Sequence, residues 1–381
     1  MPFGVYVHVP FCAQRCDYCD FATWTDKGHL VQAYVHACVT DLRRRAASGE
    51  MRRATSVFFG GGTPSLLPAE SLVSILDAIE RAPGAEVTVE CNPDSVDAVK
   101  LVAFARAGVT RASLGVQSLQ PHVLAALGRT HDQRNVAQAI VWARDAGIDR
   151  INVDLIYGTP GETLDDWRCT LDGALALEPD HVSAYALTVE PGTPLGRAVA
   201  DHSRSGPDDD DQAEKYAIAD DVLTAAGLEW YEISNWARPG GECRHNLLTW
   251  DQGAYLGVGC AAHGHTGGRR WWNVRTPERY VELVAAGRAP EAGSERLDAA
   301  GRAEEAFTLA LRTRGGAPLH IAAEPEARAL AEQGMVALAR GRVALTRSGR
   351  LLASDLTARL VLAGAAGPAP GPALALGRLD C

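Results

Sequence analysis

The chain of 381 residues has no apolar run that approaches the roughly 18–20 residues of a membrane-spanning helix. Its first residues enter a strand-like pattern directly and lack the basic region and apolar core of a signal peptide. An excess of basic residues is also missing, because the formal net charge is -10, which argues against non-specific nucleic-acid binding. We therefore expect a cytoplasmic protein with no nucleic-acid partner.

The sequence has no cysteine pattern of a disulfide-rich secreted protein. Apart from one N-terminal group, its cysteines are scattered, as is usual in a reducing compartment. Four of them lie in apolar stretches and are predicted to be small buried hydrophobic residues: Cys38, Cys91, Cys169 and Cys260.

What the chain does have is a C-x3-C-x2-C group formed by Cys12, Cys16 and Cys19. Three thiolates at this spacing can ligate three irons of a [4Fe–4S] cube and leave the fourth iron open to another ligand. The alternatives are coincidence or a zinc site, but zinc prefers a fourth Cys or His at matching spacing, and none lies nearby. In radical S-adenosylmethionine (SAM) enzymes the open iron binds the amino and carboxylate groups of SAM. An electron from the cluster then splits the sulfonium to give a 5′-deoxyadenosyl radical.

Six short apolar runs alternate with helical patterns over the first ~190 residues, which predicts parallel strands covered by helices. The expected strands are Val5–Val9, Ser56–Phe59, Glu86–Cys91, Arg111–Val116, Arg150–Ile156 and Val182–Thr188. The expected helices are Leu30–Ala46, Ala69–Arg81, Val96–Ala107, Pro121–Ala146 and Thr163–Leu177. Six units favour a partial, open α/β barrel, (β/α)6, over a doubly wound sheet, because the polar residues fall at strand ends, where barrel enzymes carry their chemistry.

Polar residues after these strands predict a ligand pocket. In Gly60-Gly-Gly-Thr-Pro64 the glycines let the backbone approach a ligand and expose N–H groups that would hold the SAM amino group, although a Gly triplet alone is also a plain turn. Glu90 is a candidate acceptor for the ribose or amino group, unless it is a surface carboxylate. Arg129 would bind the methionyl carboxylate with two hydrogen bonds. Gln117 and Asp154 complete this polar ring.

Composition changes divide the rest of the chain. We expect a barrel with the cluster and SAM site over residues 1–228 and an aromatic-rich, Gly-punctuated linking region over 229–298. Residues 299–363 are expected to form a smaller α+β, winged-helix-like module, and residues 364–381 a flexible tail. The module lacks a concentrated basic recognition helix, so packing or docking is a better prediction for it than DNA binding.

Several motifs occur together and in order: Tyr6-Val-His-Val-Pro-Phe-Cys12, the Gly60–Pro64 run, Gly115-Val-Gln-Ser118 and Asp154-Leu-Ile-Tyr-Gly158. Nearly the whole chain, from Tyr6 to Leu362, thereby resembles the radical SAM family that contains oxygen-independent coproporphyrinogen III oxidase. The resemblance implies a radical SAM barrel whose cluster ligands are Cys12, Cys16 and Cys19. It further implies SAM contacts from Tyr6, Tyr18, Gly61, Gly62, Thr63, Glu90, Gln117, Arg129, Asp154, Thr188 and His263.

Two places separate the branches of that family. The oxidases have a further cysteine two residues after the third cluster ligand, where this chain has Phe21, a side chain that neither ligates metal nor relays protons. The segment His245-Asn-Leu-Leu-Thr-Trp250 resembles the His-Asn-x-x-Tyr-Trp motif of the heme chaperone branch, with Thr249 in place of the tyrosine. Both places favour the chaperone branch.

A heme carrier needs an iron ligand, a flat apolar slot and donors for two propionates. His245 is the first candidate ligand, followed by Cys243 and His263. The candidate slot walls are Trp236, Trp250, Trp271 and Trp272, and the candidate propionate donors are Arg238 and Arg244. The alternative is that His245 and Asn246 cap a loop and the tryptophans are core residues.

The sequence therefore predicts a heme chaperone that binds a [4Fe–4S] cluster, SAM and heme and passes heme to acceptor hemoproteins, including respiratory enzymes at the membrane. We expect a cytoplasmic position that extends to the inner membrane face. One alternative is a coproporphyrinogen III oxidase, in which the radical would take hydrogen from a propionate before carbon dioxide is lost. Another is a radical SAM enzyme with an unrelated substrate. Radical chemistry would require a reductant such as a flavodoxin or ferredoxin.

Overall fold

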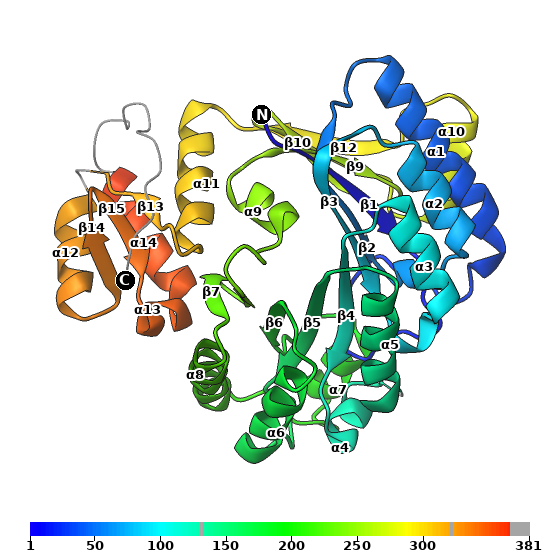
Figure 1. Ribbon diagram of the computed structural model, residues 1–381. Coiled ribbons are helices and arrows are strands. Elements are labelled where there is room, and N and C mark those ends of the chain that lie inside the picture. Colours follow the sequence, from blue (N-terminus) through cyan, green and yellow to red (C-terminus); the bar gives the residue numbers. More distant parts are fainter. Residues whose placement is uncertain (130, 132, 321–322, 366–381) are drawn as a thin grey trace.

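Figure 1 shows the computed structural model, which describes residues 1–129, 131, 133–320 and 323–365. Within these residues, six parallel strands lie side by side in chain order, as expected for consecutive β-α units. They are β1 (Phe3–Val9), β2 (Ala54–Gly61), β3 (Arg81–Cys91), β4 (Arg111–Gln117), β5 (Arg150–Tyr157) and β6 (His181–Ala186). The curved sheet and its helices form the partial, open α/β barrel that the strand pattern predicts.

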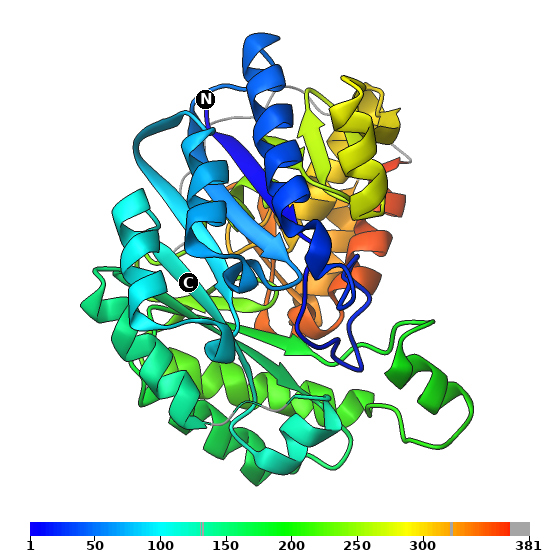
Figure 2. The same cartoon turned by 90° about the vertical axis from the view of Figure 1, so that its right-hand side faces the viewer.

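Helices cover the outer face of this sheet (Figure 2). They are α1 (Val31–Ala47), α2 (Ala69–Asp77), α3 (Ala98–Ala107), α4 (Pro121–Ala126), α5 (Gln133–Asp145) and α6 (Leu164–Leu175). On this face α1 packs against α2, α2 against α3 and α3 against α5. Two of the helices begin at a capping side chain: in α3, Asp97 accepts from the N–H of Lys100, and in α6, Thr163 and Asp166 form a reciprocal capping box. Buried Val, Ile, Leu and Phe side chains between the two layers make the main core.

The single helix predicted over Pro121–Ala146 is wrong, because the structure has two helices there. Gly128 adopts a left-handed φ of 70°, and the N–H of Arg129 donates to the carbonyl of Leu124, which ends α4. Residues 128–135 contain no apolar side chain, so the sequence itself indicates this break, and the single predicted helix wrongly spans it. The break places Arg129 on a turn at the edge of the sheet.

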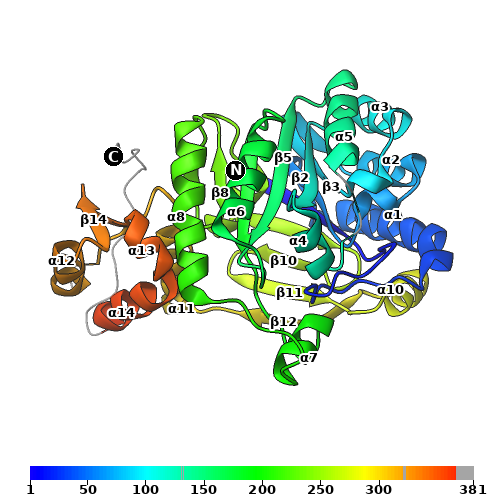
Figure 3. The ribbon, with the colours of Figure 1, turned by 90° about the horizontal axis from the view of Figure 1, so that it is seen from below.

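The sheet is longer than the sequence predicts. Beyond β1 it continues through β9 (Ala254–Val258), β10 (His263–Thr266), β11 (Arg269–Asn273) and β12 (Glu291–Arg296), and β9 is parallel to β1. Beyond β6 it continues through β8 (Asn235–Ala237) and β7 (Glu229–Glu232). Residues 229–298 thus add strands at both ends of the sheet; Figure 3 shows β10, β11 and β12 from below. The division of the chain into domains at residue 228 stays a prediction.

Three further helices pack on the sheet, two beside the outer helices and one in its hollow. They are α8 (Asp209–Ala225), which packs against α6, α10 (Pro277–Ala285), which packs against α1, and α9 (Arg244–Trp250). The last lies in the hollow of the sheet and contacts β1, β2 and β9 (Figure 1). A short helix, α7 (Pro194–Ala200), follows β6.

The C-terminal residues build a module with its own apolar core. It contains α11 (Ala299–Leu311), β13 (Ala317–Pro318), α12 (Glu324–Glu332), β14 (Val336–Ala339), β15 (Arg342–Leu345), α13 (Arg347–Leu351) and α14 (Ala353–Ala365). Its small sheet has the order β13-β15-β14. Of the predicted tail, residues 364 and 365 belong to α14, and residues 366–381 lie outside the described residues.

Cys38, Cys91 and Cys260 are buried as predicted, whereas Cys169 is exposed on the outer side of α6, so that prediction is wrong. Its neighbours in sequence suggested an apolar environment, but the helix turns it outward. Among the described residues, no helix is long and apolar enough to cross a membrane.

Candidate functional site

A cavity of about 620 Å³ opens at the C-terminal edge of the parallel strands. It is lined by the three motif cysteines and by most of the residues that the family resemblance implies for SAM. These are Cys12, Cys16, Tyr18, Cys19, Gly61, Gly62, Thr63, Glu90, Gln117, Arg129, Asp154 and Thr188. The fold thus brings together side chains that are separated by as many as ~175 residues, because successive parallel strands end at the same edge.

The cysteine loop follows β1 directly. The N–H of Cys12 donates to the carbonyl of Trp24 at 3.0 Å, and the hydroxyl of Thr63 lies 3.7 Å from the Cys12 sulfur. Burial raises the pKa of the Cys12 and Cys19 thiols. Among the described residues, no three His, Cys, Asp or Glu side chains gather around one point as the ligands of a single metal ion do. A [4Fe–4S] cube takes one thiolate on each iron, so its cysteines need not share a point.

The glycine run after β2 makes a close approach that no larger residue would permit. A Cβ on Gly62 would lie 2.8 Å from the carbonyl oxygens of Val9 and Phe11 and 3.0 Å from the Cys12 sulfur. The N–H groups of Gly61, Gly62 and Thr63 all donate within the protein, to Glu90, Val9 and Phe11. The expectation that they would hold the SAM amino group is therefore wrong. An amino group needs acceptors, and carboxylates supply these here.

Two half-buried carboxyl groups, those of Glu90 and Asp154, face this cavity. Asp154 accepts hydrogen bonds of 2.8 Å from Ser113 and from Asn152. Glu90 accepts from the N–H of Gly61 at 3.1 Å. Burial, together with the nearby Asp154, raises the pKa of Glu90 to about 8. A cationic ligand placed between the two carboxyls would relieve their repulsion.

Arg129 places a cation at the same cavity. A Cβ on Gly115 would lie 2.9 Å from its guanidinium, so the glycine makes room for it. The buried Nε of Arg129 has no hydrogen-bond partner among the described residues. A buried donor without a partner costs free energy, which a carboxylate ligand would recover. Three thiols, two carboxyls and this guanidinium fit a [4Fe–4S] cluster and the charged groups of SAM.

Tyr6 and His263 do not line the cavity. The Tyr6 hydroxyl lies 3.1 Å from Nδ1 of His8, beneath the glycine run, and burial raises the Tyr6 pKa. His263 is exposed on β10, with its ring 6.0 Å from that of Trp272. Phe21, at the position of the oxidases' further cysteine, is exposed and lines the cavity mouth.

His245 lies at the opposite end of the barrel interior, on α9. Only 5% of it is exposed, and its Nδ1 lies 3.1 Å from the hydroxyl of Ser56. The rings packed around it belong to Phe58, Tyr255 and Tyr6, at centroid distances of 5.4, 6.3 and 6.5 Å. Burial lowers the pKa of His245 to about 4, so this imidazole is neutral at pH 7.

The tryptophans proposed as walls of a heme slot do not pack around His245. Trp236 is fully buried on the helix-covered face and donates to Asp220 of α8, so its assignment to a slot is wrong. Trp271 and Trp272 lie on β11, and Trp250 is half-buried at the end of α9 near Glu232. Of the proposed propionate donors, Arg244 donates to the carbonyl of Gly84 and Arg238 to that of Ala226.

Comparison with known proteins identifies the relatives of this chain. Residues 6–172 match the radical SAM superfamily. The heme chaperone HemW of Mycobacterium tuberculosis is 46% identical over 371 residues, which cover 95% of each chain. The chain belongs to the HemW family. HemW of Bacillus subtilis is 34% identical over 369 residues, covering 93% of this chain and 97% of that protein. Membership of this radical SAM family implies a [4Fe–4S] cluster and SAM as cofactors.

Among solved structures, coproporphyrinogen III oxidase (HemN) from Escherichia coli superposes with a TM-score of 0.80. The match covers 94% of this chain and 90% of that chain, at 21% identity. At this identity the likeness shows the fold alone. The HemN fold is shared by the barrel and by most of the remaining chain.

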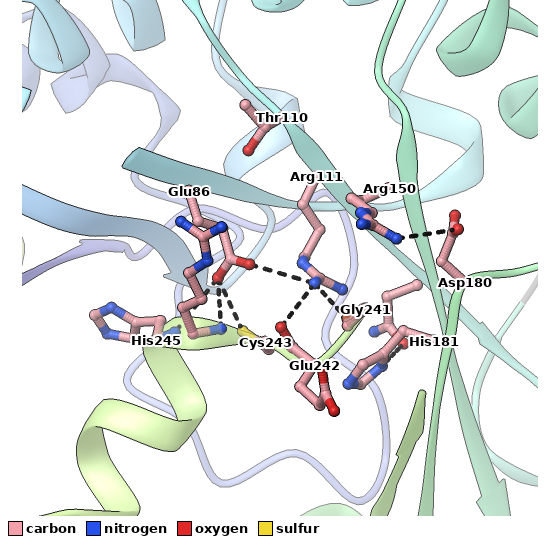
Figure 4. Close-up of polar contacts among 12 residues, drawn as sticks. Glu86, Thr110, Arg111, Arg150, Asp180, His181, Gly241, Glu242, Cys243 and His245 are labelled. Atoms are coloured by element: carbon pink, nitrogen blue, oxygen red, sulfur yellow. Dashed lines mark hydrogen bonds and ion pairs between the residues drawn. The ribbon is translucent and has the colours of Figure 1, made fainter. Parts of the chain in front are cut away.

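Sequence reasoning missed the polar residues around α9. Glu86 of β3 and Arg111 of β4 are both buried and lie beside the segment that precedes His245 (Figure 4). No motif marks them. The available signal was a carboxylate and a guanidinium at the starts of two otherwise apolar runs that were predicted to be neighbouring strands.

Proposed function

We propose that this chain is a heme chaperone that binds heme, a [4Fe–4S] cluster and SAM and transfers the heme to acceptor hemoproteins. The observation that carries the proposal is the 46% identity to a protein named as a heme chaperone over 95% of both chains. Phe21 in place of the oxidases' further cysteine and the His245–Trp250 segment support the same branch. We infer respiratory enzymes at the inner membrane face as acceptors and a cytoplasmic position for the chain.

The residues around the cavity have separate tasks under this proposal. Cys12, Cys16 and Cys19 hold the cluster, and the side chains of Glu90 and Asp154 hold the cationic part of SAM. Arg129 holds its carboxylate. When bound, the cluster supplies the electron needed for reductive cleavage of SAM, for which we propose a flavodoxin or ferredoxin as the reductant.

For heme, His245 is the proposed iron ligand because a neutral imidazole is the form that binds iron, and the pKa of about 4 keeps His245 neutral. Its neighbours Tyr6, Phe58 and Tyr255 supply flat apolar surface. Cys243 precedes it by two residues and is the second candidate ligand.

The test combines heme uptake with turnover. Reconstituted protein is titrated with heme and followed by its Soret band. In parallel it is incubated with coproporphyrinogen III, SAM and dithionite. We expect heme uptake without formation of protoporphyrinogen. His245→Ala is expected to abolish uptake, whereas the matched control His122→Ala, an exposed histidine on α4, is expected to retain it.

Each outcome decides the proposal. Protoporphyrinogen formation would favour the oxidase and overturn a chaperone-only function. Uptake that is unchanged in His245→Ala would remove His245 as the ligand and direct attention to Cys243 and His263. The absence of heme uptake by the native sequence would overturn the proposed function itself.

A further inference from the structure

We propose that Glu86 and Arg111 are positioning residues that hold the segment Gly241–His245 closed in the barrel, and that heme reaches His245 only when this segment leaves them. The inference rests on the proposed function, because it states how the heme ligand of that function is regulated. It concerns the base of the barrel interior, away from the cluster cavity.

Glu86 binds the start of α9 through a single oxygen (Figure 4). Its Oε1 accepts from the N–H of Arg244 at 2.9 Å and from the N–H of His245 at 3.3 Å. The Cys243 thiol lies 3.5 Å from the same atom. These N–H groups are the unpaired donors of the first helical turn, and Cys243 at the cap position provides no side-chain acceptor. A carboxylate from another strand therefore replaces the usual local cap.

Arg111 completes the closure from the next strand. Its Nη2 donates to the carbonyl of Gly241 at 2.6 Å and to that of Glu242 at 3.2 Å, and it lies 3.3 Å from Oε2 of Glu86. Tyr231 adds one contact, since its hydroxyl accepts from the N–H of Cys243 at 3.4 Å. The segment is thus bound on both sides of Cys243 by side chains that belong to the sheet.

The burial of His245 makes this arrangement a closed one. Heme needs open space beside its iron ligand, whereas 95% of His245 is covered and its ring is packed against Phe58 and Tyr255. A Cβ on Gly4 would lie 3.1 Å from the His245 ring, so α9 is already in close contact with β1. Heme ligation therefore requires α9 and the segment before it to move away from the sheet.

Two features make this segment suited to local opening. Arg111 has a buried Nε and a buried Nη1 without hydrogen-bond partners among the described residues, so the closed state leaves part of its bonding capacity unused. Gly240, directly before the segment, has a left-handed φ of 77°, and the segment itself begins with Gly241, whose backbone can adopt other conformations. Apparent heme affinity then equals the intrinsic affinity multiplied by the open fraction.

The chain contains a reporter for this opening that is independent of heme. Cys243 is 3% exposed and lies within the segment, whereas Cys38 and Cys260 are fully buried in the main core. Peptide-mapped labelling with iodoacetamide therefore distinguishes local opening, which labels Cys243 alone, from global unfolding, which labels all three. Exposed Cys169 serves as the positive control.

The decisive variant is Glu86→Gln, which keeps an acceptor for the α9 amides but removes the charge that pairs with Arg111. We expect at least tenfold faster labelling of Cys243 with no change at Cys38 and Cys260. Arg111→Lys retains the charge but loses the planar donor geometry, and we expect a smaller increase in the same direction. If Cys243 is labelled at the same rate in the native protein and in both variants, the proposal that Glu86 and Arg111 hold the segment closed is overturned.

A heme experiment on the same variants tests the link to function. Heme uptake, followed by the rise of the Soret band, is expected to be accelerated in Glu86→Gln by the same factor as Cys243 labelling. Faster labelling combined with slower uptake would overturn the proposal, because the pair would then orient the ligand in place. If the native protein binds no heme while Cys243 is still labelled through local opening, the proposed function is overturned, but the role of Glu86 and Arg111 in holding the segment closed is retained.

A variant that does not fold does not end the test. In the native protein, labelling of Cys243 is measured against urea concentration. Local opening exposes little surface, so its rate should vary weakly with urea, while labelling of Cys38 should vary steeply. An equally steep dependence for Cys243 would show that it is exposed only by global unfolding and would overturn the proposal.

Discussion

The two ends of the barrel interior are built from the same strands, but their polar side chains differ in how accessible they are to a ligand. At the C-terminal edge, the cysteines, the glycine run, Glu90 and Asp154 surround a cavity of about 620 Å³. At the N-terminal end, Glu86, Arg111 and His245 are paired with one another or with the backbone of α9 and its preceding segment, and they leave little exposed surface. The hollow of the sheet thus contains two sets of polar groups. Those at the C-terminal edge surround an open cavity, and those at the N-terminal end bind α9 and the segment before it.

The largest expected effect is loss of the cluster at the C-terminal edge without any change at the N-terminal end of the interior. Cys16→Ser replaces a thiolate ligand of the cluster, so we expect no [4Fe–4S] absorbance after reconstitution, while Cys243 labelling stays at the native rate. Cys169→Ser, which changes an exposed cysteine on α6, should retain the full cluster content. Full cluster content in Cys16→Ser would contradict the ligand assignment.

The next prediction concerns the packed end. In Gly4→Ala the new methyl group meets Leu248 at 2.7 Å and the His245 ring at 3.1 Å, so α9 must shift. Overpacking of this kind costs about 1–3 kcal/mol of unfolding free energy. We expect that loss in urea denaturation, together with faster Cys243 labelling. The control Gly28→Ala adds a methyl group where nothing lies within 4 Å and should change neither quantity.

The open end should show a pH dependence that the packed end lacks. Because the pKa of Glu90 is raised to about 8, its carboxyl holds a proton at pH 7, and a cationic ligand favours its release. SAM affinity should therefore increase as pH rises from 6 to 8, by at most about tenfold per pH unit, and level off above 8.

The matched variant is Glu90→Gln, in which the pH dependence of SAM affinity, measured by calorimetry, should disappear. The same raised pKa means that without ligand Glu90 costs stability as pH rises from its unfolded value of 4.5 through about 8. A native SAM affinity that is flat between pH 6 and 8 would show that Glu90 does not face the cationic part of SAM.

The smallest expected effect tests how the cysteine loop is held. Arg204 lies 3.1 Å from Oδ2 of Asp17, between two cluster cysteines, and also donates to the carbonyl of Ala126 before the Arg129 turn. This ion pair is half-exposed, so its contribution is below about 1 kcal/mol. Arg204→Ala should lose its cluster to a chelator about threefold faster than the native protein.

Arg197→Ala provides the control for that experiment, because Arg197 lies on the neighbouring α7 and donates to the carbonyl of Gly192 without touching the cysteine loop. A cluster that dissociates at the same rate in both variants would assign Arg204 to surface packing.

The sequence predicts the open end better than the packed end, for physical reasons. Strands β1 to β6 are continuous apolar runs, so their ends, and the residues after them, can be located without a structure. Strands β7 to β12 are only three to six residues long, and β9, β10 and β12 each contain a glycine, so periodicity does not reveal them. The break at Gly128, by contrast, is indicated by a stretch without apolar side chains, residues 128–135, which the single predicted helix wrongly spans.

The packed end depends on pairing between distant residues. Glu86 and Cys243 are separated by 157 positions, and no local pattern predicts that a strand carboxylate caps a helix so far along the chain. Similarly, the motif alone predicts His245 as a ligand, and only the structure shows that its side chain is buried.

Strand β3 contributes a carboxylate to each end of the interior, Glu86 to the base and Glu90 to the cavity. Side chains four residues apart on a strand share one face and are separated by about 13 Å along it. A shift of β3 by one residue against β2 and β4 would turn both carboxylates outward at once, because successive side chains alternate between faces. Insertions or deletions within this strand should therefore abolish both sites together, whereas the loops that follow it can change length independently.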